Sequence, residues 1–209
     1  MLLDPLWELL EKRLFPLPST DELFNPYNGH DPRLDLPGGQ EIRRQNLRNY
    51  LASFHEPPPI LLVGEAPGPW GCRFSGVPFT GEAQLCGGTL PFKGQQSSLA
   101  TSPYRERSGQ LLWELLLPHH RRFLLWNCLS FHPHDPGKPL SIRNPRVQEV
   151  TDHLELLRAV VATVAPERVV AIGRHAEDAL RRLGVPAVYV RHPSQGGTPR
   201  FREGMRTIF

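Results

Sequence analysis

Four short apolar segments alternate with helical patterns along the sequence, and this alternation limits the fold more than any other feature. The segments cover residues 60–63, 123–127, 168–172 and 187–191. Continuous apolar runs of this length are typical of strands that are buried on both faces. Because helical patterns separate them, we expect an α/β protein with three α/β/α layers and a central, mainly four-stranded parallel sheet.

The segments between the strands divide into helices and long loops. Helices are predicted for residues 2–14, 40–54, 108–117, 145–164 and 174–183. Residues 16–39 are rich in Pro, Gly, Asn and Asp, which is typical of an extended arm or loop. We therefore predict a single domain over residues 1–209 with a helical and Pro-rich arm at 1–39. Residues 64–107 form a loop of a length that is usually functional or disordered, and its part 86–107 has no assigned role.

The composition favours a soluble globular protein, because 39% of the 209 residues are hydrophobic and 22% are charged. No apolar run approaches the roughly 18 residues that span a membrane, and the N-terminus lacks the basic start of a signal peptide. We expect a cytoplasmic monomer without a membrane partner. Cys72, Cys86 and Cys128 form no CxxC pair, which argues against a disulfide framework and a cysteine-bound zinc or iron–sulfur site.

Positive charge is concentrated near the C-terminus. Residues 168–209 contain eight Arg and three acidic residues, a net charge of +5, whereas the rest of the chain carries −2. A basic segment suits a polyanion such as DNA. Of the 24 basic residues 21 are Arg, which could reflect phosphate recognition or genome composition.

Three polar segments follow the ends of predicted strands. Residues 64–68 (Gly-Glu-Ala-Pro-Gly) come after the first strand, Asn127 ends the second, and residues 192–194 (His-Pro-Ser) follow the fourth. Ligands of parallel α/β sheets bind beyond the carboxyl ends of the strands. We therefore expect these segments to meet at one edge of the sheet and to form an active site.

Each polar segment offers a specific chemistry. Glu65 could polarise a water or stabilise a cation. The Asn127 amide offers a donor and an acceptor to a ligand, or it caps the strand end. His192 could hydrogen-bond a carbonyl oxygen that gains negative charge, or it is structural. Phe79 lies in a loop without periodicity, where its ring could stack on a planar ligand or anchor the loop in the core.

Other cofactor chemistry is disfavoured. The turn after the first strand lacks the Lys-Ser/Thr of a phosphate-binding loop and the GxGxxG of a dinucleotide site. His132, His134 and Asp135 are spaced too loosely for a metal site and favour a polar loop or a phosphate contact. We therefore predict no metal, nucleotide or flavin cofactor.

From Ile60 to Arg200 these motifs resemble, in order and spacing, the uracil-DNA glycosylase superfamily. Residues 64–68 resemble the first motif of its thermophile-type, iron–sulfur branch. Residues 67–71 (Pro-Gly-Pro-Trp-Gly) followed by 76–79 (Gly-Val-Pro-Phe) resemble the single-strand-selective monofunctional branch. Trp126-Asn127 and His192-Pro-Ser match the base-reading strand and the second motif. The cysteines that bind the cluster of the first branch are missing, so we predict no cluster.

The resemblance implies a DNA glycosylase that flips uracil, or a related deaminated or modified base, and hydrolyses its N-glycosidic bond to leave an abasic site. The resemblance implies that Phe79 stacks on the base, that Asn127 forms hydrogen bonds with the edge of the base, and that His192 stabilises negative charge on its O2 atom. The resemblance also implies that Glu65 activates the water. Three further residues would surround the base: Gly64, Ala66 and Gly68. Four would contact the DNA: Ser194, Gln195, Gly196 and Arg200.

Two departures from the family pattern affect these roles. Ala66 stands where the superfamily often has an Asp or Asn that activates water, so this role is assigned to Glu65. Gly68 stands where some members have a Tyr that rejects the methyl group of thymine, so the pocket could admit modified uracils. No Lys lies in the motifs, and we expect no lyase activity. A glycosylase for deaminated purines and a non-catalytic module for damaged or single-stranded DNA remain alternatives.

Overall fold

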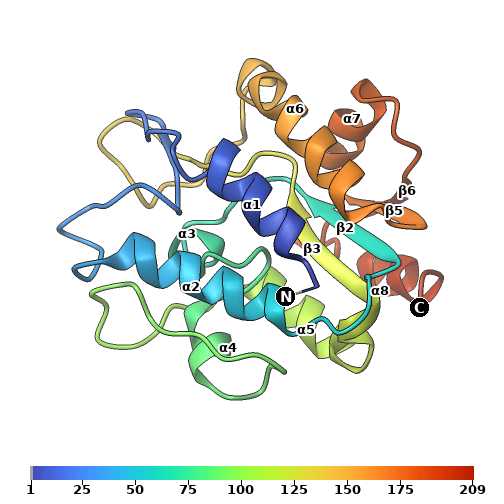
Figure 1. The fold of residues 1–209 in the computed structure, drawn as a ribbon, viewed down its shortest axis with the longest axis horizontal. Coiled ribbons are helices and arrows are strands. Elements are labelled where there is room, and N and C mark those ends of the chain that lie inside the picture. The colour runs from blue at the N-terminus through green and yellow to red at the C-terminus, as the bar shows by residue number, and fades with distance from the viewer. Residues whose placement is uncertain (1) are drawn as a thin grey trace.

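The computed structural model describes residues 2–209, so only the first residue of the predicted arm lies outside it. Its centre is a parallel sheet of four strands in the order β3-β2-β5-β6 (Figure 1). The strands are β2 (Ile60–Gly64), β3 (Phe123–Asn127), β5 (Arg168–Ile172) and β6 (Val188–Val190). The predicted sheet is confirmed, and each strand begins and ends within one residue of its predicted bounds.

Helices cover both faces of this sheet. Helices α6 (Val147–Val164) and α7 (Arg174–Arg182) lie on one face, and α5 (Arg107–Leu116) and α8 (Thr198–Arg206) lie on the other (Figure 1). The crossovers through α6 and α7 run in one direction along the sheet, whereas the crossover through α5 runs in the opposite direction. Because such crossovers are right-handed, α5 must lie on the opposite face. The three-layer α/β/α prediction is therefore confirmed.

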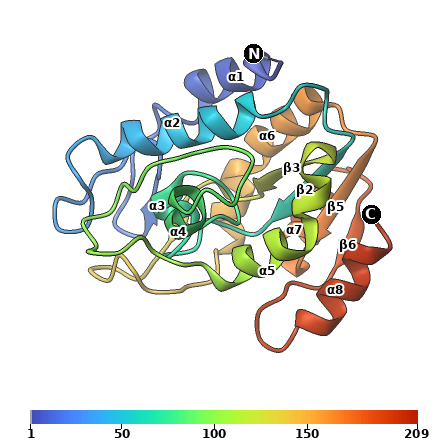
Figure 2. The same cartoon turned by 90° about the horizontal axis from the view of Figure 1, so that it is seen from below.

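Two N-terminal helices complete the core beside β3. Helix α2 (Gly39–Ala52) carries the buried Tyr50, whose hydroxyl accepts a hydrogen bond of 2.8 Å from the backbone N–H of Leu125. This bond satisfies a donor of an edge strand. Helix α1 (Asp4–Arg13) packs against α6 and lies alongside α2 (Figure 2), where the Arg48 guanidinium covers the Trp7 ring at 5.0 Å.

The predicted arm is held against the rest of the protein. Its strand β1 (Leu23–Phe24) pairs in antiparallel fashion with β4 (His132–Pro133). Asp35 is fully buried and forms ion pairs with two fully buried arginines, Arg43 and Arg73. Because a buried carboxylate that loses its cations is strongly destabilising, this cluster ties the arm to the loop after β2.

Short helices interrupt segments that the sequence predicts as loops. They are α3 (Cys72–Ser75) and α4 (Glu82–Cys86). A 3-10 helix, η1 (Leu117–Arg122), connects α5 to β3. The sequence patterns predict no helix after residue 183, but α8 begins at Thr198 and contains Arg200. Pro199 in the first turn and the buried pair Phe201 and Met205, four residues apart, are the helix signals in that segment.

Cys72 and Cys128 are buried and Cys86 is exposed, and all three are free thiols. Within residues 2–209 no helix is both long and apolar enough to cross a membrane.

Candidate active site

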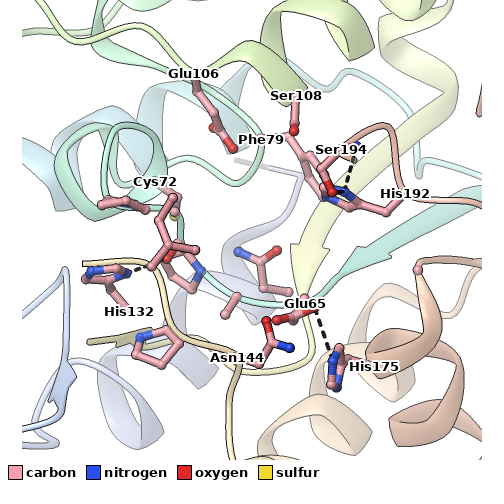
Figure 3. Close-up of a pocket in the computed structure, with 18 of the residues that line it drawn as sticks. Glu65, Cys72, Phe79, Glu106, Ser108, His132, Asn144, His175, His192 and Ser194 are labelled. Carbon is pink, nitrogen blue, oxygen red and sulfur yellow. Dashed lines mark hydrogen bonds and ion pairs between the residues drawn. The ribbon is translucent and has the colours of Figure 1, made fainter. Parts of the chain in front are cut away.

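A cavity of about 670 Å³ opens at the carboxyl edge of the sheet. Segments at the ends of all four strands line it: residues 65–70 after β2, Asn127 at the end of β3, 173–175 after β5, and 191, 192, 194 and 195 after β6 (Figure 3). Parallel sheets bind ligands at this edge. The segments that the sequence places at strand ends therefore meet in one cavity.

Most of the predicted site residues line this cavity. They are Glu65, Ala66, Gly68, Phe79, Asn127, His192, Ser194 and Gln195. The other three, Gly64, Gly196 and Arg200, do not line it. Gly196 follows Gln195 in a turn with φ of 73°, and Arg200 is exposed on α8.

Gly64 allows two other side chains to approach the end of β2. A Cβ atom at this position would lie 2.4 Å from two ring carbons of Phe79 and 2.8 Å from Oδ1 of Asn127. Phe79 itself has φ of 52°, in the left-handed region that costs energy for residues other than glycine. Such a conformation persists only where the surroundings enforce it, so the Phe79 ring is held in a fixed place.

The Asn127 side chain is buried and available to a ligand. Asn127 is only 4% exposed. No other residue between 2 and 209 makes a hydrogen bond with its side-chain amide. Buried amides are nearly always paired. Because Asn127 lines the cavity, its donor and acceptor are free for a planar ligand with complementary groups.

His192 is a neutral hydrogen-bond donor. Burial, together with the charge of Arg191, lowers the pKa of His192 to about 4. The backbone N–H of Ser194 donates to Nδ1 of His192 at 3.2 Å, and the Ser194 hydroxyl lies 2.8 Å from the same atom. Because Nδ1 accepts, Nε2 carries the proton. The imidazole centroid lies 6.1 Å from that of Phe79.

Glu65 is paired with a residue that the sequence reasoning missed. Its Oε2 lies 3.8 Å from Nε2 of His175 (Figure 3). Burial raises the pKa of Glu65 above its ordinary value, and His175 opposes this shift. The Glu65 backbone is fixed because its carbonyl accepts a hydrogen bond of 2.9 Å from Leu129. His175 follows the end of β5, so the strand-end argument could have identified it.

Glu106 is a second cavity residue that the sequence did not reveal. It directly precedes α5, and it and His192 reach the cavity from different sides (Figure 3). Its Oε2 is buried without a hydrogen-bond partner among the described residues, and burial raises the pKa of Glu106 to about 7. No pattern marks this residue, because it lies in a long loop without periodicity.

His132 supports the loop after β2. Its Nδ1 lies 2.8 Å from the carbonyl oxygen of Pro67, and burial lowers the pKa of His132 to about 4. This contact connects the first motif to β4. Across residues 2–209, no three His, Cys, Asp or Glu side chains gather in a way that could hold a metal ion.

Five arginines are among the described residues that line the cavity, and they are called its cationic rim below: Arg105, Arg107, Arg143, Arg174 and Arg191. Two of them are engaged, Arg143 with Glu149 at 2.8 Å and Arg174 with Glu177 at 2.6 Å. Arg105 and Arg107 are exposed, and no residue of the described chain forms an ion pair with them. Only Arg174 and Arg191 belong to the basic C-terminal segment. The other three arginines of the cationic rim come from earlier segments, which the charge distribution along the sequence does not indicate.

Comparison with known proteins places the chain in a family. The family model of the uracil DNA glycosylase superfamily matches residues 53–201. The fold is similar to the crystal structure of wild-type SMUG2 from Pedobacter heparinus, with a TM-score of 0.68 and 16% identity over 99% of this chain and 94% of that chain. At this identity the likeness shows the fold alone. No curated protein is significantly similar in sequence.

Proposed function

Because the chain belongs to the uracil DNA glycosylase superfamily, we propose that it is a monofunctional glycosylase that removes uracil or a related deaminated or modified base from DNA. One observation carries this proposal. An unpaired buried amide (Asn127), a neutral imidazole donor (His192) and a fixed aromatic ring (Phe79) meet in a cavity at the edge of the sheet. These are the groups that a flipped uracil requires.

The base has to leave the duplex before it reaches these groups. The bond from N1 to the sugar is inaccessible inside the stack, and extruding the nucleotide costs a few kcal/mol. In the cavity the base stacks on Phe79. The Asn127 amide accepts a hydrogen bond from N3–H and donates one to O4. Both contacts recover part of the extrusion cost and select a base with the uracil edge.

Bond cleavage moves an electron pair onto the base. As the bond between N1 and C1′ breaks, negative charge develops on the base, and Nε2–H of His192 donates a hydrogen bond to O2. The sugar becomes an oxocarbenium-like cation. Glu65 accepts a proton from the water that attacks C1′. The products are the free base and an abasic site.

The absence of an amine nucleophile supports a monofunctional reaction. No lysine is among the described residues that line the cavity, so no Schiff base with the sugar is expected. The test is an oligonucleotide with a single uracil, with a thymine oligonucleotide as the control. We expect strand breaks only after alkali treatment. Breaks without alkali would show lyase activity, and no breaks in either case would contradict the proposal.

The two unpaired arginines at the rim should bind the DNA backbone. We expect Arg105→Ala and Arg107→Ala each to weaken binding to any sequence and to lower the slope of log affinity against log salt by about 1, because each removes one phosphate contact. Fluorescence anisotropy across a salt series measures this slope. Arg158→Ala on α6, away from the cavity, is the matched control. Unchanged slopes for both rim variants would place the DNA elsewhere.

Gly64→Ala should lower the rate of base release by at least about tenfold, since small displacements of positioned groups are costly in catalysis. The added methyl group would force Phe79 and Asn127 away from the end of β2. Single-turnover rates measure the effect, and thermal unfolding checks that the variant is folded. A folded variant with the wild-type rate would show that these side chains tolerate displacement.

A further inference from the structure

The Glu106 carboxyl group fits into space that three glycines leave open. A Cβ atom at Gly71 would lie 2.0 Å from Oε2 of Glu106, and one at Gly109 would lie 3.2 Å from the same oxygen. A Cβ atom at Gly68 would lie 3.5 Å from Oε1. These glycines belong to the loop after β2 and to the first turn of α5. The backbone therefore encloses the carboxyl group at the cavity wall.

This carboxyl group has no partner that would explain its burial. Glu106 is the N-cap residue of α5, but its side chain makes no capping hydrogen bond, and its buried Oε2 is unpaired among the described residues. The negative charge of Glu106 contributes to the raised pKa of the nearby Cys72 thiol. With its own pKa raised to about 7 by burial, Glu106 is partly ionised near neutral pH. Both forms of a buried carboxyl group need a polar partner.

The contacts assigned under the proposed function leave one edge of the base for the rest of the cavity wall, to which Glu106 belongs. His192 takes O2, and Asn127 takes N3 and O4. The remaining edge of the ring carries C5 and C6. Glu106 reaches the cavity from a different side than His192 (Figure 3), next to Gly68, which has no side chain that could fill the space. The C5 position is where thymine differs from uracil, by one methyl group.

We propose that Glu106 is a specificity-determining residue that excludes thymine, because its carboxyl group tolerates water but not a methyl group beside C5 of the flipped base. The hydrogen at C5 of uracil leaves space for a water that pairs with the carboxyl group. The methyl group of thymine occupies that space and leaves the carboxyl group buried without a partner. This loss should lower kcat/KM for thymine by about tenfold to 100-fold. This inference rests on the proposed function and names a selectivity that the proposed function leaves open.

The test compares uracil and thymine release by wild type and three Glu106 variants. The substrates are duplex oligonucleotides with uracil or thymine opposite guanine, and the readout is kcat/KM for each base. We expect Glu106→Ala and Glu106→Met to raise the ratio of thymine release to uracil release by at least about tenfold. Glu106→Gln keeps a polar group of the same size and should exclude thymine as the wild type does. Glu114→Ala, an exposed residue of α5, is the matched control.

Each outcome of this experiment decides the inference. A gain of thymine release is not a result of misfolding, so it would support the role. Continued exclusion of thymine by both Glu106→Ala and Glu106→Met, with uracil release intact, would overturn it. So would thymine release by the wild type, or loss of uracil release in both variants. Failure of the wild type to release uracil would instead contradict the proposed function itself.

Discussion

Glu65→Gln is expected to slow base release about 100-fold to 10,000-fold, the contribution usual for a general base. The amide keeps the shape of the side chain but cannot accept the proton of the attacking water. KM should change little, because Glu65 acts on the water and makes no contact with the base. Single-turnover rates and DNA affinity, measured together, separate the two effects. Glu155→Gln, which replaces an exposed carboxylate of α6 that does not line the cavity, is the matched control.

The same substitution should alter the pH dependence. Glu65 has to be ionised to act as a base, and burial raises its pKa, so the wild-type rate should fall as the pH falls through that raised value. The Glu65→Gln rate should be flat over the same range. His192 does not produce this decline, because its pKa of about 4 lies lower. A wild-type rate that stays constant as the pH falls to the ordinary pKa of a free carboxyl group would exclude Glu65 as the base.

His192→Ala is expected to slow base release about 100-fold to 1,000-fold, the effect usual for loss of one donor to a developing negative charge. The neutral imidazole lies in place before the reaction, because Ser194 fixes Nδ1 through its backbone N–H and hydroxyl. The loss should appear in kcat, since the charge on O2 exists only as the bond breaks. His30→Ala, an exposed histidine outside the cavity, is the control.

The role of His192 depends on how the loss of activity in His192→Ala divides between kcat and KM. A loss confined to KM would mean that His192 binds the base equally before and during cleavage. Base release at the wild-type rate by folded His192→Ala would remove His192 from the mechanism.

The sheet and the polar strand ends could be predicted from sequence because both depend on local patterns. A buried parallel strand is a continuous apolar run, as at β2 and β3, and the strand order brings the carboxyl ends together. This logic was sufficient to place Asn127 and His192 in one cavity. It applies equally to His175 after β5, which the sequence reasoning passed over.

Other features depend on contacts between distant segments and leave no local pattern. Glu106 is buried because Gly71 and Gly109 let the backbone close around it, and these glycines are unremarkable in the sequence. The pairing of β1 with β4 joins segments more than one hundred residues apart. Helix α8 has local signals in Pro199 and in the pair Phe201 and Met205. The two glycines before it and its several arginines nevertheless give the segment a composition typical of a loop. The long insert beyond Cys86 similarly gave no sign that it brings Glu106 and two arginines to the cavity.

Release of the free base is the most direct measurement of the central claim. The purified protein is mixed in excess with an oligonucleotide that carries one uracil, and in parallel with one that carries hypoxanthine, and the free base is quantified by mass spectrometry. We predict free uracil in an amount equal to the abasic sites formed, and none from Glu65→Gln or His192→Ala on the same timescale. Tight, steeply salt-dependent DNA binding by the wild type without release of either base would contradict a glycosylase and indicate a binding module.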